Sequence, residues 1–146
     1  MIIAVYTIGA CTGSSEGSEL RIEPAMTLGE EYNDNIFLTP TNEAVDYITR
    51  VIPSFHALYQ SKLWDWDVNY AYEYRYYAHK TYGNYSTNRL NLTNTTRLIE
   101  EFLYLKVIDV YTPVSLSVAR DYTQESLNVN QSDQNVLTVN PYMVFH

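Results

Sequence analysis

Hydrophobic and polar residues alternate along most of this chain with a period of two. The clearest case is 64–78, where every second residue from Trp64 to Ala78 is apolar or aromatic and the residues between them are mostly polar. Successive side chains of a strand point to opposite faces, whereas a helix would spread these residues around its circumference. The pattern therefore predicts a long β-strand with one apolar and one polar face.

Five further segments follow the same rule less strictly. In 20–32 only Glu30 interrupts the apolar row, whereas 102–116 is more continuously apolar. The chain also contains 15 tyrosines and 2 tryptophans, which favour a pleated surface. We predict an all-β fold, an antiparallel up-and-down meander of about six long strands. The predicted strands are 20–32, 47–59, 64–78, 89–99, 102–116 and 135–145.

The connections between these segments alternate between short and long. Segments 60–63 and 100–101 are short, whereas 33–46, 79–88 and 117–134 are long and polar. Transmembrane barrels have tight periplasmic turns and longer external loops, and about 9–11 residues per strand suffice to cross the bilayer. The predicted strands reach that length, while soluble strands average about 5–6 residues. The meander is therefore predicted to be part of a transmembrane β-barrel with its long connections outside.

A barrel wall gives each row of side chains a role. The polar rows would line a water-filled lumen of mixed charge, which argues against strong ion selectivity. On the apolar rows, Trp64 and Trp66 are predicted at the periplasmic interface as part of an aromatic girdle. The outer girdle is predicted to contain Tyr74, Tyr76 and Tyr77. The predicted lumen-facing residues are Arg21, Glu23, Asp65, Asp67, Glu73, Arg75, Arg89 and Arg97.

Two mid-strand tyrosines fit this picture less well. Tyr70 and Tyr72 fall on the predicted lipid face, at a depth where aliphatic side chains are more usual. A protein–protein contact on that face is the alternative explanation for them.

The N-terminal segment is ambiguous. Residues 1–10 are apolar, lack a basic start and are short for a complete signal peptide. They lead into Ile8-Gly9-Ala10-Cys11 and a Gly/Ser-rich spacer, an order similar to a lipoprotein processing site with Cys11 as the acylated residue. The alternatives are a signal-peptide remnant and a first strand. We predict that 1–19 is a signal-peptide remnant or linker and that 20–146 forms barrel strands.

Composition and motifs exclude several classes of function. A net charge of −8 without a basic patch argues against nucleic-acid binding. The single cysteine cannot form an internal disulfide, and the three histidines lack metal-ligand spacing. Asn33-Asp34-Asn35 offers oxygen ligands for calcium, although these are also ordinary turn residues. No phosphate loop, nucleophile elbow or zinc-protease motif is present. We therefore expect no enzyme activity, no metal and no cofactor.

Several segments together resemble a known family. The run 30–38, EEYNDNIFL, is the most specific, and 46–53, 70–77 and 140–142 add to it. These segments resemble outer-membrane β-barrel proteins associated with PEP-CTERM/exosortase systems, and the likeness extends over about 20–145. The resemblance implies a porin-like envelope protein of a Gram-negative bacterium, linked to exopolysaccharide or its export machinery.

The predicted strand number departs from that family. Such barrels are several times longer, and single-chain outer-membrane barrels begin at about eight strands. The sequence is therefore expected to be an N-terminal fragment of a larger barrel, or else a complete chain whose copies close one barrel as an oligomer.

Two functional hypotheses follow. The first is a non-catalytic outer-membrane barrel, porin-like or associated with exopolysaccharide secretion, whose main partner is outer-membrane lipid. The alternative is a soluble extracellular lipocalin-like or β-sandwich binding module, lipid-anchored through Cys11. Dependence of the folded state on detergent separates the two, because a soluble module stays folded without it.

Overall fold

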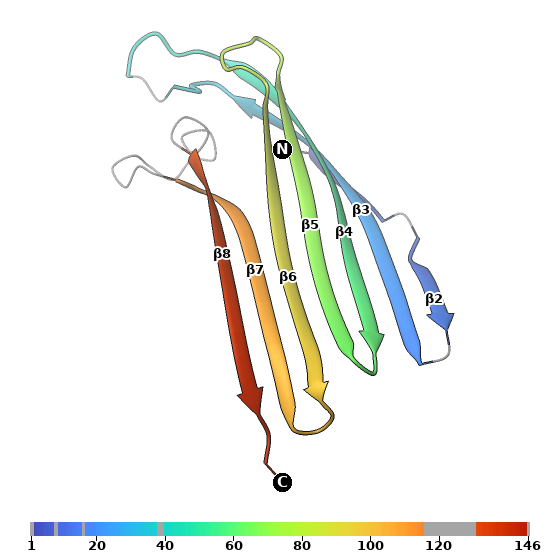
Figure 1. Cartoon of the computed structure of the whole chain (residues 1–146). Helices are drawn as coiled ribbons and strands as arrows, with labels where there is room; N and C mark the ends of the chain where they lie inside the picture. The colour runs from blue at the N-terminus through green and yellow to red at the C-terminus, as the bar shows by residue number, and fades with distance from the viewer. Residues whose placement is uncertain (1, 8, 16, 38–39, 116–130, 146) are drawn as a thin grey trace.

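The computed structural model is a single antiparallel sheet of eight strands (Figure 1). It describes residues 2–7, 9–15, 17–37, 40–115 and 131–145. From β3 to β8 each strand pairs with the next in the chain, and β1 and β2 both pair with β3. The predicted all-β up-and-down meander is confirmed, and the sheet is open rather than closed into a barrel. The strands are β1 (Ile2–Thr7), β2 (Cys11–Ser15), β3 (Ser18–Asn33), β4 (Asp46–Ser61), β5 (Trp64–Tyr77), β6 (Tyr85–Ile99), β7 (Leu103–Ser115) and β8 (Gln131–Met143).

The six predicted strands correspond to β3 to β8. The largest differences are at the starts of β6 and β8, each of which begins four residues before the predicted position. The start of β6 was not predicted because Ser86, Thr87 and Asn88 are all polar and show no alternation. They nevertheless pair with β5 and continue its ladder of hydrogen bonds. The predicted loop 79–88 therefore ends at Asn84, and most of the predicted loop 117–134 lies outside the described residues.

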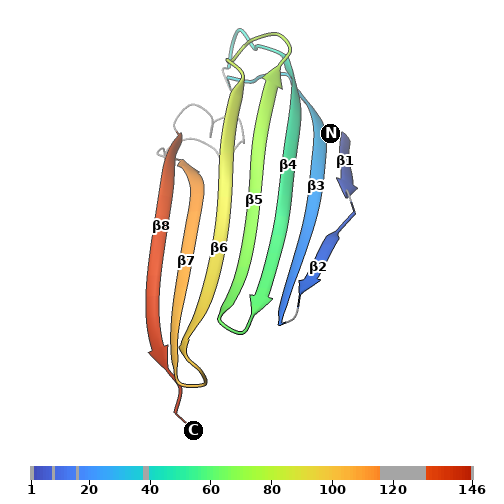
Figure 2. The same cartoon turned by 45° about the vertical axis from the view of Figure 1, so that its right-hand side comes forward.

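The N-terminal segment adds two short strands to the edge of the sheet. β1 and β2 lie end to end beside β3 (Figure 2). This is the first-strand alternative for 1–19. Cys11 is exposed in β2 opposite Ile22. Its acylation, and removal of the segment as a signal peptide, stay predictions.

Two prolines lie at interruptions of the ladder. Proline has no N–H to donate, so strands accommodate it at edges and irregularities. Pro24 in β3 faces the break between β1 and β2, because the pairing stops at Ala25 on one side and Ile22 on the other. Pro53 in β4 lies where the pairing with β5 skips from Val51 to Ser54.

The sheet forms one layer with almost no core. Among the described residues the buried hydrophobic side chains are Ile36, Ile48 and Tyr77, against which Ala44 and Tyr82 pack. The accessible surface is 9980 Å², whereas a compact globular protein of this size would expose about 7,700 Å². Within the described residues, no helix is both long and apolar enough for a membrane span.

Candidate functional site: two faces of one wall

The strand register decides which residues share a face. Residues paired across neighbouring strands lie on the same side of a sheet, and side chains alternate along each strand. All eight residues predicted to face the lumen fall on one side, which we call the polar face. That the polar face lines a lumen stays a prediction.

Charged side chains on the polar face are paired with one another across and along the strands. Glu73 accepts hydrogen bonds from Arg75 Nε at 2.5 Å and from Arg89 Nη1 at 3.3 Å. His56 Nε2 lies 2.9 Å from Asp67 Oδ1, and His56 Nδ1 lies 3.6 Å from Glu23. Most of the charged side chains on this face thus meet an opposite charge, which lowers the field that a passing solute would experience, whereas Glu19 and Lys106 form no ion pair with a described residue. The other ion pairs of this face among the described residues are Arg21–Glu23, Glu31–Arg50 and Asp65–Arg97.

The polar face is hollowed at mid-height. A cavity of about 820 Å³ is lined by residues from β3 to β7 together with Gly9 and Ala10, which lie between β1 and β2, so this side of the curved sheet is the concave one. The small side chains of Ala25, Ser54 and Ala71 lie in register across three strands and form its floor. Below them His56 and Asn69 lie side by side.

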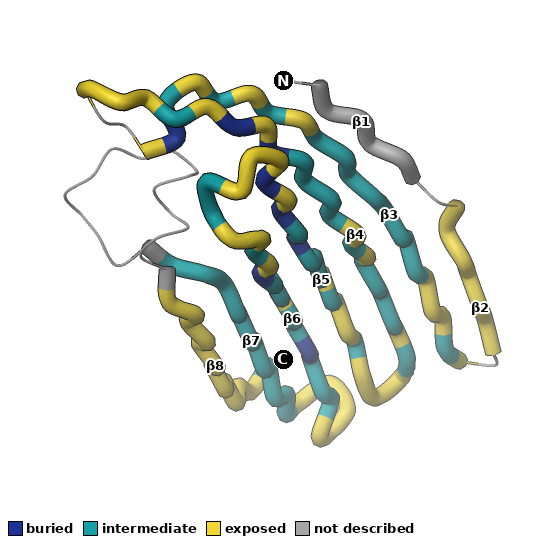
Figure 3. Tube along the Cα trace, turned by 90° about the horizontal axis from the view of Figure 1, so that it is seen from above, coloured by how far each residue is buried: buried dark blue, intermediate teal, exposed yellow. Residues whose placement is uncertain are grey.

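Two long connections cover the polar face at one end. Ile36 and Ala44 from 34–45 and Tyr82 from 78–84 pack on Ile48 and Tyr77, which are paired across β4 and β5. Figure 3 shows buried positions gathered mainly towards this end of β4, β5 and β6, while β8 is exposed. The prediction of Tyr77 in the outer aromatic girdle is wrong, because it lies on the polar face and the loop residues bury it.

Asp46 connects the two covering loops. Its Oδ1 accepts hydrogen bonds from the backbone N–H groups of His79 and Tyr47, both at 2.8 Å, and its Oδ2 from Thr81 N at 3.2 Å. Burial by itself raises the pKa of Asp46, but the hydrogen bonds from His79, Thr81 and Tyr47 outweigh burial and hold the pKa below its ordinary value. The carboxylate therefore supports the loops at neutral pH, and that support is lost only as pH falls through the lowered pKa, below 3.8. Sequence reasoning missed this residue, which stood at the boundary of a predicted loop.

The other side of the sheet, the apolar face, carries large hydrophobic side chains that contact no second layer. Most exposed large hydrophobics of the strands lie here; the exceptions are Val136 and Tyr142 in edge strand β8, and Leu98 and Ile99 at the β6 bulge. The group on the apolar face is Leu20, Tyr32, Tyr47, Phe55, Trp64, Trp66, Tyr76, Leu137, Val139 and Met143.

The apolar residues form a band that slants across the strands. On β3 the apolar residues of 20–28 are centred on Pro24. The residue of β8 that is level with Pro24 is Asn135, reached across the sheet through the paired residues Phe55, Tyr70, Leu90 and Tyr111. The apolar row of β8, 137–143, is instead centred on residue 140. The band thus moves five residues towards the short turns over five strand steps, one residue per strand.

Several polar groups on the apolar face lie on the loop side of this band, whereas Asn94 and Asp109 lie within it. Ser86 of β6 is level with the apolar Leu28 and Val51 but lies above the slanted band. Tyr70, which fitted poorly in the sequence, donates a hydrogen bond of 2.6 Å to Asn88 Oδ1 on β6, so its hydroxyl is satisfied within the sheet.

Aromatic residues mark both ends of the band. Towards the loops, Tyr32 and Tyr47 contact each other at 5.2 Å between ring centroids. Tyr76 is exposed on the same face, and the hydroxyl of Tyr74 accepts a hydrogen bond from Asn84 at 3.0 Å. Tyr32 and Tyr47 were missing from the predicted girdle, although the alternation pattern had placed both on the apolar row.

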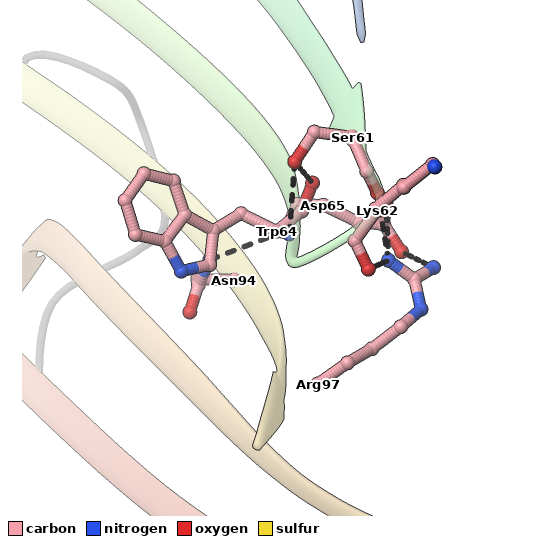
Figure 4. Close-up of polar contacts among 6 residues, drawn as sticks. All are labelled: Ser61, Lys62, Trp64, Asp65, Asn94 and Arg97. Atoms are coloured by element: carbon pink, nitrogen blue, oxygen red, sulfur yellow. Dashed lines mark hydrogen bonds and ion pairs between the residues drawn. The ribbon is translucent and has the colours of Figure 1, made fainter. Parts of the chain in front are cut away.

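Trp64 and Trp66 mark the short-turn end. In Figure 4 the Trp64 indole extends away from Asp65 and Arg97. Arg97 Nη1 donates to the Ser61 carbonyl at 2.9 Å and pairs with Asp65, which ties β6 to the turn before Trp64. Asn94 Nδ2 donates to the Asp65 carbonyl at 3.3 Å. These contacts fix the turn from which Trp64 projects.

Neither the arrangement of possible metal ligands nor the comparison with known proteins assigns a chemical activity to this chain. Among the described residues no group of three or more His, Cys, Asp or Glu side chains is placed to hold a metal ion. Asn33 Oδ1 accepts a hydrogen bond from Asn35 N at 3.0 Å, which is ordinary turn behaviour. Comparison with protein-family models, curated proteins and solved structures finds no match to this chain.

Replacing Asp46 by alanine should release the two covering loops. The substitution leaves three backbone donors without their acceptor, which we expect to lower the opening free energy of the loops by about 2 kcal/mol. This corresponds to about thirtyfold faster trypsin cleavage after the exposed Lys80 when cleavage follows loop opening. The matched control is Asp34→Ala, an exposed loop carboxylate, which should leave the rate unchanged. Equal cleavage of both variants would show that Asp46 does not hold the loops.

Proposed function

We propose that this chain forms part of the wall of a porin-like, non-catalytic β-barrel in the outer membrane of a Gram-negative bacterium. The apolar face would contact lipid, and the polar face would contact water in the lumen. The loops at 34–45 and 78–84 would lie outside, and the short turns in the periplasm. The resemblance to PEP-CTERM-associated barrels is a further expectation, and the proposal does not depend on it.

The slant of the apolar band is the observation that carries the proposal. With about 3.3 Å per residue along a strand and about 4.8 Å between strands, one residue per strand corresponds to a tilt of about 35°. Strands of transmembrane barrels tilt by about 35–45° to the membrane normal. The same tilt gives the band on β3 a height compatible with the roughly 25 Å apolar belt of such barrels. A soluble sheet has no reason to maintain a band inclined at this angle.

Strand length supports the same reading. Strands β3 to β8 have 13–16 residues, against about 9–11 needed to cross a bilayer. The excess fits a wall that continues beyond the lipid. Lipid contact would also account for an apolar face without a second protein layer, since a sheet in water covers its apolar face with packed elements.

The open sheet sets a condition on the proposal. Within a bilayer the unpaired backbone groups of a sheet edge cost several kcal/mol each, so a spanning sheet must close. The edges formed by β1 and β2 on one side and β8 on the other therefore need further strands, either from the same polypeptide or from other copies. Exopolysaccharide or export machinery as a partner stays an expectation from the resemblance alone.

Tryptophan fluorescence tests the membrane position directly. The only two tryptophans are Trp64 and Trp66, two residues apart on the apolar face. In the tilted wall Trp66 should lie about 5 Å deeper than Trp64. In vesicles of brominated phospholipids, the Trp64→Phe variant should be quenched most by bromines deep in the acyl chains, and the Trp66→Phe variant by bromines nearer the headgroup.

The same measurement can reject the proposal. Full quenching by aqueous acrylamide with no effect of brominated lipid, together with a folded monomer in buffer without detergent, would favour the soluble binding module instead.

An arginine scan of one strand tests the slant. The tilted band places its centre on β6 at about Leu92, three strand steps from Pro24, and leaves Ser86 outside it. Leu92→Arg should therefore lower the free energy of unfolding in lipid vesicles by about 2–4 kcal/mol, and Ser86→Arg by about 0–1 kcal/mol. Denaturant titrations followed by tryptophan emission measure both. Similar losses for the two variants would contradict the slanted band.

A further inference from the structure

We propose that the hollow of the polar face is a binding site for neutral, polyhydroxylated small molecules of the sugar or polyol class. The site lies on β3 to β7, within the part of the chain that the structure describes, at mid-height below the covering loops. It concerns the polar face alone and holds whether or not the apolar face meets lipid.

The floor of the hollow lets a ring-shaped ligand approach the sheet closely. Ala25, Ser54 and Ala71 are level with one another on three adjacent strands, and neighbouring strands are about 4.8 Å apart. Ser54 Oγ already donates to the Ala25 carbonyl at 3.4 Å. The floor is thus a strip of small side chains about 10 Å across, two strand spacings wide, which leaves room for one pyranose unit with its hydroxyl groups. The volume of about 820 Å³ accommodates more than one such ring.

The charges around the hollow argue against an ionic ligand. Its Glu, His and Arg lining residues each have a partner of opposite sign: Glu23 with Arg21, His56 with Asp67, and Arg89 with Glu73. A carboxylate entering the hollow could approach Arg89 but would also meet Glu23, and an ammonium group could approach Glu23 but would also meet Arg89, so neither sign of charge is favoured overall. Separating a solvated ion from water without an uncompensated countercharge is unfavourable. The hollow therefore disfavours anions and cations alike.

The remaining hydrogen-bonding capacity is that of amides. Asn69 and Asn91 are paired across β5 and β6, and both are exposed in the hollow. Asn69 uses one N–H towards Asp67 Oδ1 at 3.1 Å, which leaves its carbonyl oxygen to accept. Asn91 has no side-chain hydrogen bond to any described residue. Each amide can donate and accept, which matches a hydroxyl group that does both.

Half of the Arg89 side chain is solvent-exposed, and one of its nitrogens is engaged with Glu73. Its other N–H groups can donate to ligand hydroxyls from the side of the hollow opposite His56. A ligand would therefore meet donors and acceptors from three adjacent strands around an apolar floor.

Saturation-transfer NMR on the folded protein in detergent tests the site, using maltose as the neutral probe, galacturonate as the acid and glucosamine as the amine. Maltose should bind most tightly. Asn91→Leu should weaken maltose binding about fivefold to tenfold, as expected for one lost hydrogen bond. Ala71→Phe should abolish it by filling the floor. The matched control is Asn140→Leu, an exposed asparagine on the polar face outside the hollow, which should bind as the unaltered protein does.

The strand signal in circular dichroism establishes that each variant is folded. Unchanged maltose binding in folded Ala71→Phe, tighter binding of the acid or the amine, or no binding of maltose by the unaltered protein would each overturn the proposal. None of these outcomes bears on the lipid quenching of Trp64 and Trp66, so the two proposals can fail separately.

Discussion

A single sheet with one apolar face needs something to cover that face, and the rest of this structure depends on that constraint. Burying apolar surface contributes roughly 25 cal/mol per Å², and an ordinary domain obtains this by packing two layers together. Here the described part of the chain provides no second layer, and its small cluster around Ile48 and Tyr77 occupies only one end. Ladder hydrogen bonds hold the strands together, but they do not remove side chains such as Phe55 or Leu137 from water. Whatever covers the apolar face must therefore come from outside the described residues.

The polar face must keep its charged side chains either hydrated or paired. A concave surface with so many charged groups would be costly if it were dry, because an unpaired charge away from water is strongly destabilising. Several of its ion pairs, such as Asp65–Arg97 and Glu73–Arg89, join neighbouring strands and so help to fix the register, whereas Arg21–Glu23 and Glu73–Arg75 lie within one strand. The Glu73–Arg75 pair is the most buried of them and lies beneath the loop end. Below it the side chains become more exposed, and the surface changes from a packed cap to a hydrated wall.

Much of the fold was accessible from the sequence because alternation over more than ten residues leaves few alternatives to a strand. The same alternation sorted Asp65, Arg75 and Arg97 onto one face correctly, since face membership depends only on counting along a strand. The slant was not accessible, because it depends on how neighbouring strands are paired. The loop cluster was missed for a related reason: Asp46 and Thr81 are 35 residues apart and meet only in the folded chain. Tyr77 was misplaced although counting along its strand puts it on the polar face with Arg75; its burial by Ile48 and Tyr82 depends on contacts of the folded chain.

The prolines of the sheet have a consequence for hydration. Pro24 and Pro53 lie on adjacent strands at nearly the same height, and each coincides with a gap in the ladder. Backbone groups facing such a gap lack their cross-strand donor, and in a bilayer lipid cannot replace it. Water arriving from the concave side can. Pro24 and Pro53 thus mark the positions of β3 and β4 at which main-chain groups would depend on water for a hydrogen-bond partner.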